Sequence, residues 1–396
     1  MYRIGDEEIE AVTAVLRSGE LFRYWPRGIE GDHRGEAAKL EAELAAAMAV
    51  PHAIAVSSGT AALHCALAAL EIGPGDEVII PGFTFVATAT AVLAVGAVPI
   101  VAEVDETLTI DVDDVARKIT DRTRAVIPVH MAGLPADLGR ILELAGRSGL
   151  RVIEDACQAI GGTYRGRPLG AHGDVGCLSF NQFKTLTCGE GGAVLARDRR
   201  IHERALIFHD PGYSFISEGY ELQEPIFAGL NLRTSELLAA MLRVQLRRLP
   251  GFLAALRRAH LALREALVDD PIARPVRLHD REGAVGSHLM MLLPDEDRAA
   301  HFAGLLRRAG LYAGRPADQR LHVYDHWEVL MRRRGGHVPA RDPLHGLPEG
   351  AYHPAMCPRT LDLSTRAVGV LLSPLWDDDA LRSARDALVA AAAEVR

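Results

Sequence analysis

The sequence has 396 residues, of which 48% are hydrophobic, which suits one large domain plus a smaller one with a sizeable buried core. Its formal net charge of −8 argues against a nucleic-acid-binding protein, because such proteins carry basic patches. Five cysteines without C-x-x-C pairs or metal-ligand spacing indicate reduced thiols in a cytoplasmic protein, and we expect no signal peptide, membrane span or metal site.

The first half of the chain alternates between two kinds of pattern. Amphipathic helices are predicted at 6–18 and 35–49. Short β-branched runs then predict strands at 52–57, 76–81, 98–105, 124–131 and 150–156. Helix-like stretches separate them at 59–70, 85–95, 111–119 and 137–147. This alternation is typical of βαβ units, so we expect an α/β fold whose mostly parallel central sheet is flanked by helices.

The second half begins with two strands around a glycine-rich loop, at 175–180 and 191–197, followed by a polar loop at 209–231. A helical pattern runs from 234 to 267, with Pro250-Gly251 marking a kink or a domain boundary. The remainder has an α+β pattern, with strands at 287–293 and 368–374 and helices at 295–310 and 377–396. We therefore predict a large domain at 1–249 and a smaller C-terminal domain at 250–396.

The glycine-rich loop, SFNQFKTLTCGEGG, contains Lys184, one of only three lysines in a chain with 41 arginines. Lys39 and Lys118 lie in charged, helix-like stretches, where a solvated helix face explains them. Lys184 lies among apolar residues and glycines. An amine in such surroundings can lose its proton and attack a carbonyl, which a guanidinium cannot do. Lys184 is therefore a candidate nucleophile.

Asp155 ends the strand predicted at 150–156, at the position where α/β sheets bind ligands. It could be a helix cap or a member of a buried ion pair. It could also be the partner of a protonated heterocyclic nitrogen, as in pyridoxal phosphate enzymes. Gln158, three residues later, could face the same ligand.

Small polar residues follow another strand, in VSSGTAAL. Gly59 and Thr60 would place free N–H groups and a hydroxyl at a helix N-terminus, which is a good anion site, although an ordinary capped helix is an equal alternative. Ser179 could add a second hydroxyl or simply end its strand. Phe85 is either a core residue or a ring that stacks on a planar cofactor. Asn231 could merely cap the helix that follows it.

These residues together would supply an amine, a carboxylate, a phosphate cradle and a stacking ring at successive strand ends, which is the set that pyridoxal phosphate needs. The histidines at 130, 209, 322 and 326 make no metal pattern, and we expect structural, capping or substrate-adjacent roles for them.

Over residues 52–246 the sequence resembles the DegT/DnrJ/EryC1/StrS family of sugar aminotransferases, which are pyridoxal phosphate enzymes of fold type I. The motifs that carry the resemblance include SSGTAAL, GPGDEVIIPGFTFVATATAV, VIEDACQAIGGTYRGRPLG, GDVGCLSFNQFKTLTCGEGG and GLNLRTSELLAAMLRVQL. The resemblance implies that Lys184 would form the Schiff base with the cofactor. Asp155 would pair with the pyridinium nitrogen, and Gln158 would lie by the phenolic oxygen.

The resemblance also implies how the rest of the cofactor is held. Gly59, Thr60 and Ser179 would bind the phosphate, and Phe85 would stack on the ring. Asn231 would reach the phosphate of the other subunit, so that the active sites would lie at the interface of an obligatory homodimer.

The implied reaction is amino transfer from glutamate or glutamine, through the pyridoxamine phosphate form, to a keto or aldehyde carbon of a sugar, sugar nucleotide or cyclitol. Such reactions belong to antibiotic or polysaccharide sugar biosynthesis, and the loops at 18–33, 209–228 and 322–356 are expected to shape the acceptor pocket. The alternative is a sugar dehydratase of the same family, in which a histidine stands at the position of Lys184. A cofactor-binding regulator is disfavoured, because the chain has no helix-turn-helix extension and no basic patch.

Overall fold

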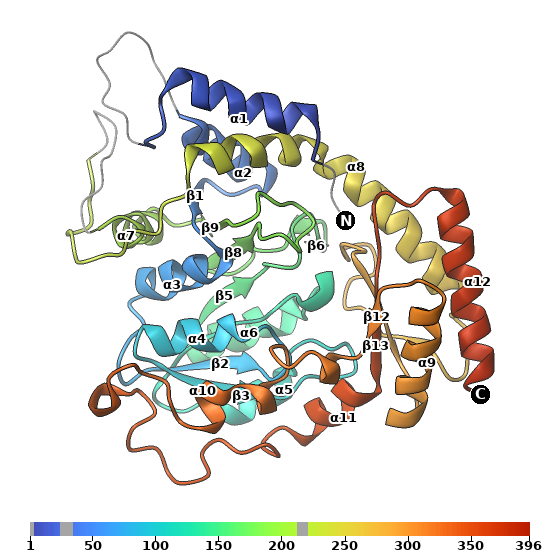
Figure 1. Cartoon of the computed structure of the whole chain (residues 1–396). Helices are drawn as coiled ribbons and strands as arrows, with labels where there is room; N and C mark the ends of the chain where they lie inside the picture. Colours follow the sequence, from blue (N-terminus) through green and yellow to red (C-terminus); the bar gives the residue numbers. More distant parts are fainter. Residues whose placement is uncertain (1–3, 24–34, 212–220) are drawn as a thin grey trace.

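A seven-stranded sheet forms the centre of the larger part of the molecule in the computed structural model, which describes residues 4–23, 35–211 and 221–396 (Figure 1). The strand order is β1-β9-β8-β5-β4-β2-β3. The strands are β1 (His52–Val56), β2 (Glu77–Pro81), β3 (Val98–Ala102), β4 (Thr123–Val126), β5 (Arg151–Asp155), β8 (Val175–Ser179) and β9 (Gly192–Ala196). Neighbouring strands are parallel, except that β9 is antiparallel to both β1 and β8. The predicted mostly parallel α/β sheet is confirmed.

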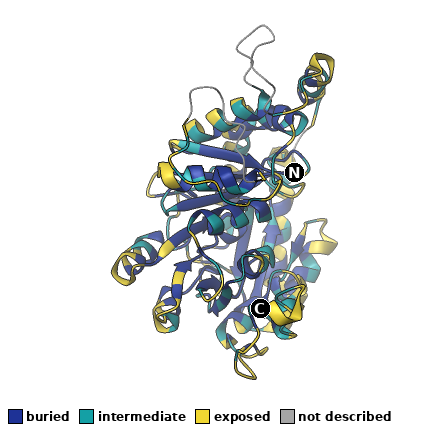
Figure 2. Cartoon of the chain, turned by 90° about the vertical axis from the view of Figure 1, so that its left-hand side faces the viewer, coloured by how far each residue is buried: buried dark blue, intermediate teal, exposed yellow. Residues whose placement is uncertain are grey.

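Helices cover both faces of this sheet because its strands are apolar on both sides. In β1, Ala53 and Ala55 belong to one core cluster, whereas Ile54 and Val56 belong to another, as expected when successive side chains point to opposite faces. One face carries α3 (Gly59–Ala69), α4 (Ala87–Ala94) and α7 (Arg199–His209). The other carries α2 (Glu36–Ala47), α5 (Val112–Lys118), α6 (Leu138–Ser148) and α8 (Glu236–Ala266), and α1 (Asp6–Ser18) packs on α8. Figure 2 shows the buried strands between helices whose outer faces are exposed.

A second, four-stranded sheet forms the smaller part, with the order β10-β11-β13-β12 and antiparallel pairing throughout. Its strands are β10 (Arg274–Pro275), β11 (His288–Leu292), β12 (Ala313–Gly314) and β13 (Ala367–Leu371). The helices here are α9 (Glu296–Arg308), α11 (Pro358–Arg366) and α12 (Asp378–Glu394). The short helix α10 (Glu328–Met331) instead packs against the larger part, because its buried Leu330 belongs to a core cluster of the large sheet. The strands β6 (Thr163–Tyr164) and β7 (Arg167–Pro168) form a separate hairpin.

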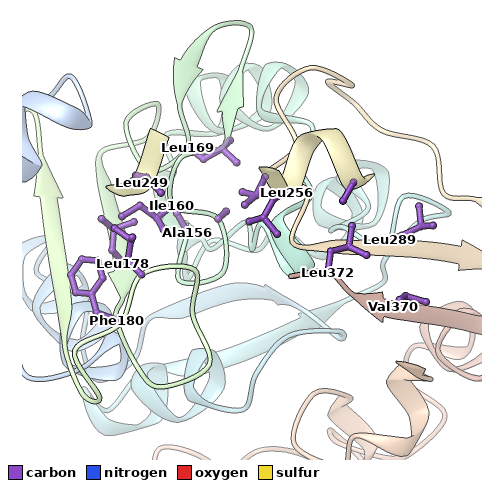
Figure 3. Close-up of a cluster of buried hydrophobic side chains, with 14 of the residues drawn as sticks. Ala156, Ile160, Leu169, Leu178, Phe180, Leu249, Leu256, Leu289, Val370 and Leu372 are labelled. Carbon is purple, nitrogen blue, oxygen red and sulfur yellow. The ribbon is translucent and has the colours of Figure 1, made fainter. Parts of the chain in front are cut away.

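One hydrophobic cluster connects the two sheets through α8 (Figure 3). It contains Leu178 of the large sheet, Leu256 of α8, and Leu289 and Val370 of the small sheet, all of them buried. The helix α8 continues as one element across Pro250. The predicted boundary between 1–249 and 250–396 therefore falls inside a helix, and the division into these two domains stays a prediction.

The pattern analysis misses α7, which follows β9. Charged residues dominate its sequence, RRIHERALIFH, and hide its apolar face. The helix begins after Asp198, whose carboxylate accepts the N–H of Ile201, and it buries Ile201, Ala205 and Leu206. Of the helices in the described part of the chain, none is both long and apolar enough to cross a membrane.

Candidate active site

The predicted site residues gather at the edge of the large sheet where its parallel strands end. Asp155 is the last residue of β5, Ser179 is the last residue of β8, and Gly59 begins α3 just after β1. Lys184 lies in the loop between β8 and β9. Because β9 runs antiparallel to β8, this loop leaves and returns at the same edge. Open α/β sheets bind their ligands there.

Asp155 is 5% exposed, and both of its carboxylate oxygens accept hydrogen bonds. The Thr88 hydroxyl donates to Oδ2 at 2.9 Å, and the N–H of Cys157 donates to Oδ1 at 3.1 Å. The Thr84 hydroxyl lies 2.9 Å from that of Thr88 and must be the donor, because the Thr88 hydrogen is committed to Asp155. These bonds hold the carboxylate in one orientation.

Neither structural alternative for Asp155 is realised. No helix begins directly after β5, and Asp155 forms no salt bridge with any residue that the structure describes. A buried carboxylate at a ligand-binding edge without a cation is consistent with a partner supplied by a cofactor.

Gly59, Thr60 and Ser179 form a polar pocket at the start of α3. Ser58 caps this helix by accepting the N–H of Ala61 at 3.0 Å. The N–H groups of Gly59 and Thr60 make no hydrogen bond within the described ranges, so they are available to an anion. A Cβ added at Gly59 would lie 2.8 Å from the Cβ of Ser179 and 2.9 Å from the Sγ of Cys157. Glycine is therefore required for the backbone to approach Ser179 this closely.

Lys184 is half-buried, and its charge acts on groups from three parts of the chain. Burial, and then the charge of Lys184, lower the pKa of His288 and of His322 to about 4. Burial raises the pKa of Cys157 and Asp155 raises it further, while Lys184 lowers it. Lys184 and Asp155 thus both act on the Cys157 thiol, and with a pKa of about 4 the imidazoles of His288 and His322 are neutral at pH 7.

Phe85 follows β2 and is 40% exposed, so it is not a core residue. Its ring lies against that of His322, with centroids 5.4 Å apart and an angle of 52° between the planes. The Thr84 N–H donates to the His322 carbonyl at 3.0 Å and holds the two segments together. An exposed aromatic face at this edge can stack on a planar cofactor.

Gln158 and Asn231 have different surroundings. Gln158 is half-buried, and its Oε1 accepts the N–H of Ala132 at 3.0 Å, which orients its amide. Asn231 is exposed, and its side chain makes no hydrogen bond to the described residues. The structure therefore brings Gln158 to the site edge, whereas the predicted role of Asn231 depends on a second subunit and stays a prediction.

Two of the four histidines noted in the sequence are structural. The Nε2 of buried His130 lies 3.0 Å from Glu154, and its Nδ1 accepts the N–H of Ala136. Burial raises the pKa of Glu154, but hydrogen bonds, first that from His130, lower it overall. His209 is buried and bonds to the Leu206 carbonyl. Within the described residues, no three histidine, cysteine, aspartate or glutamate side chains group as a metal site.

The sequence analysis misses Thr84, Thr88 and His288. A signal for the threonines exists, because Thr84 and Thr88 are two of three hydroxyl side chains in the otherwise apolar stretch TFVATATAV, and hydroxyls that are buried need partners. No pattern in the neighbouring sequence indicates His288, because this residue lies on β11 of the small sheet and not after a strand of the large sheet. Residues 24–34 and 212–220, which include parts of the predicted acceptor loops, lie outside the described residues.

The residues present fit pyridoxal phosphate. The half-buried Lys184 supplies the amine, Asp155 a carboxylate without a cation, and the start of α3 an anion cradle that a side chain on Gly59 would fill.

Comparison with known proteins agrees with this fit. A sequence model of the DegT/DnrJ/EryC1/StrS aminotransferase family matches residues 2–329. The UDP-N-acetyl-3-dehydro-alpha-D-glucosamine 3-aminotransferase of Acidithiobacillus ferrooxidans is 43% identical over 222 residues. That match covers 56% of this chain and 58% of the relative, so the chain spans little more than half the length of that relative.

Two solved structures match nearly the whole chain. DesV of S. venezuelae, in complex with a ketimine intermediate, is 31% identical with a TM-score of 0.77, and the match covers 98% of this chain and 94% of DesV. An aminotransferase from Psychrobacter cryohalolentis is 26% identical with a TM-score of 0.83, and the match covers 99% and 98% of the two chains. The expected fold type I architecture is confirmed, and the chain belongs to the DegT/DnrJ/EryC1/StrS aminotransferase family.

Proposed function

We propose that this protein is a pyridoxal phosphate-dependent aminotransferase that moves an amino group from glutamate or glutamine to a keto or aldehyde carbon of a sugar, sugar nucleotide or cyclitol. The observation that carries the proposal is the placement of Lys184, in the loop between β8 and β9, and of Asp155, at the end of β5, at the same edge of the large sheet. Among the residues that the structure describes, Asp155 has two hydrogen-bond donors but no cation, and the charge of Lys184 helps to lower the pKa of His288 and of His322.

Bound pyridoxal phosphate would supply a ring that accepts the electron pair released when the α-proton of the donor is removed. Asp155 would keep a proton on the ring nitrogen, and Lys184 would hold the cofactor covalently. The freed Lys184 amine would act as the base that removes the proton from the donor α-carbon, and in the second half of the reaction as the acid that delivers a proton to the acceptor carbon.

The neighbouring residues would orient the cofactor during these proton transfers. The N–H groups of Gly59 and Thr60, with the hydroxyls of Thr60 and Ser179, would bind the phosphate. Phe85 would stack on one face of the ring, which limits its tilt. Gln158 would donate its amide N–H to the phenolic oxygen.

Reduction of the loaded enzyme with borohydride, followed by peptide mapping, tests the cofactor assignment. The pyridoxyl group should be on Lys184, and a Lys184→Ala variant should remain unlabelled. Label on Lys39 or Lys118 in the wild-type protein would contradict the assignment.

Nitrogen-15 glutamate or glutamine with a panel of keto sugars tests the reaction. UDP-N-acetyl-3-dehydro-alpha-D-glucosamine is a suitable first acceptor, because a relative is named for it. The label should appear in an amino sugar that keeps every hydroxyl group. A deoxygenated product without nitrogen-15 would instead support the dehydratase alternative, which Lys184 disfavours because a dehydratase gains from a residue that cannot recapture the cofactor.

We further propose that the active unit is a homodimer in which Asn231 completes the site of the partner subunit. Support comes from its exposed side chain and from exposed apolar neighbours, Ile226 and Leu230, which a second copy would cover. Mixing inactive Lys184→Ala and Asn231→Ala chains should restore part of the activity, because one hybrid site keeps both groups. No recovery after verified subunit exchange would refute the arrangement.

A further inference from the structure

A strained turn lies between the candidate cofactor site and the small sheet. The short 3-10 helix η1 (Met131–Gly133) follows β4 and contains Ala132 with φ 56° and ψ 21°. This left-handed conformation costs a non-glycine residue about 1–2 kcal/mol. It persists only where surrounding contacts hold it, so the contacts of η1 are informative.

On one side, η1 and the residue before it are bonded to Gln158 and to Asp155, the last residue of β5. The N–H of Ala132 donates to Oε1 of Gln158 at 3.0 Å. The preceding residue, His130, donates its N–H to the carbonyl of Asp155, also at 3.0 Å. The turn thus contacts both polar residues expected to bind the cofactor ring.

On the other side, η1 is bonded to the segment that leads into β11. The buried Ser287 hydroxyl donates to the Ala132 carbonyl at 3.3 Å, and the N–H of Val285 donates to the Gly133 carbonyl at 3.1 Å. A Cβ on Gly133, whose φ is 75°, would lie 2.8 Å from the Cβ of Val285. The two segments are therefore packed too closely for any residue but glycine at this position.

Counting the available hydrogens and acceptor atoms shows which group donates each hydrogen bond in this network. Ser287 has one hydroxyl hydrogen, and it goes to the Ala132 carbonyl, which can only accept. The Nδ1 of His288, 3.1 Å from the Ser287 oxygen, must then be the donor in that pair. On the Gln158 amide, Oε1 is occupied by Ala132, and Nε2 makes no hydrogen bond to the described residues. The Nε2 hydrogens are available to a ligand.

We propose that Ser287 is a positioning residue for the cofactor. Its hydroxyl fixes the Ala132 peptide, the N–H of that peptide fixes the Gln158 amide, and Gln158 then donates from Nε2 to the phenolic oxygen of pyridoxal phosphate. A side chain next to the small sheet thereby controls a hydrogen bond to a cofactor held at the edge of the large sheet. The proposal rests on the function proposed above, since it needs the cofactor on Lys184.

The test uses Ser287→Ala, Gln158→Ala and the double variant as cofactor-loaded enzymes. The matched control is Ser364→Ala, because Ser364 is also buried and also donates to a main-chain carbonyl, that of Leu361, but lies in α11. The measurements are the pKa of the bound cofactor, from its absorbance as a function of pH, and the dissociation constant of pyridoxal phosphate.

A hydrogen bond donated to the phenolic oxygen stabilises its negative charge and so competes with the proton on the adjacent Schiff-base nitrogen. Both single variants should therefore raise the pKa of the bound cofactor and weaken its binding by about 3- to 10-fold. The double variant should match Gln158→Ala, because the two residues act in series. Ser364→Ala should leave both quantities unchanged.

Three results would overturn the proposal: a Ser287→Ala enzyme that behaves like Ser364→Ala, additive effects in the double variant, or an unchanged cofactor pKa in Gln158→Ala. Borohydride labelling of Lys184 in the same preparations separates these results from failure of the proposed function, in which no label would reach Lys184.

Discussion

Thr88→Val removes the hydroxyl that donates to Asp155 while nearly preserving the size of the side chain. Thr88 is fully buried on α4, and its hydrogen bond to Asp155 Oδ2 measures 2.9 Å. The change also leaves the buried Thr84 hydroxyl without its acceptor. Two hydrogen bonds are therefore lost, one to a charged group and one between neutral groups.

Typical values allow the cost to be worked out. A hydrogen bond to a charged group contributes about 1.5–3 kcal/mol and a neutral one about 0.5–1.5 kcal/mol, so the free energy of unfolding should fall by about 2–4.5 kcal/mol. Asp155 keeps its bond from the Cys157 N–H and stays in place, but one carboxylate oxygen is no longer held. If the charged bond orients Asp155 toward the ring nitrogen, the donor half-reaction should slow by about 10- to 100-fold.

Urea unfolding of the cofactor-free protein measures the first effect, and the absorbance change when glutamate or glutamine is added to the loaded enzyme measures the second. Thr90→Val is the control, because Thr90 is on the same helix and donates only to the Ala87 carbonyl at 3.3 Å. If the Thr88 and Thr90 variants have the same half-reaction rate, the hydroxyl of Thr88 does not orient Asp155 and the reasoning is refuted.

Two further predictions concern the phosphate cradle and acid stability. Gly59→Ala should weaken pyridoxal phosphate binding about tenfold or more, because its Cβ would lie 2.8 Å from that of Ser179. Equilibrium dialysis measures the affinity for pyridoxal phosphate. The control is Gly146→Ala, because a Cβ there would meet no atom within 4 Å, and equal affinities of the two variants would contradict the prediction. The protein should also lose stability as the pH falls from about 6.5 toward 4. Burial lowers the pKa of five histidines from 6.5, to about 4 in His202, His260, His288 and His322 and to about 3 in His209. As the pH falls, these histidines therefore bind protons in the unfolded chain before they do so in the folded protein. Their contribution to the free energy of unfolding is complete above their pKa in the unfolded chain and is lost as the pH falls toward their pKa in the folded protein. A free energy of unfolding that is constant across this range in urea titrations would show that the histidines do not limit acid stability.

The alternation of strands and helices, and the candidate residues that follow the strands, could be predicted from the amino-acid pattern alone. Both inferences depend on local features. Hydrophobic periodicity reflects which side chains are buried within a few residues, and parallel strands carry their carboxyl ends to a common edge. Lys184, Asp155, Gly59 and Ser179 could be selected in this way, because each lies at or just after a predicted strand or in the loop that joins two of them.

How these residues are held depends on contacts between segments that are distant in the chain. Thr88 lies 67 residues from the Asp155 carboxylate it orients, and Ser287 lies 155 residues from the Ala132 carbonyl it contacts. The placement of β9 between β1 and β8, which returns the Lys184 loop to the sheet edge, is likewise a result of strand pairing. A local pattern records whether a side chain is apolar or polar, but it does not record which distant segment supplies a hydrogen-bond partner. Thr88 and Ser287 obtain their partners only when the sheets and helices pack together, because packing brings these distant segments within hydrogen-bond distance.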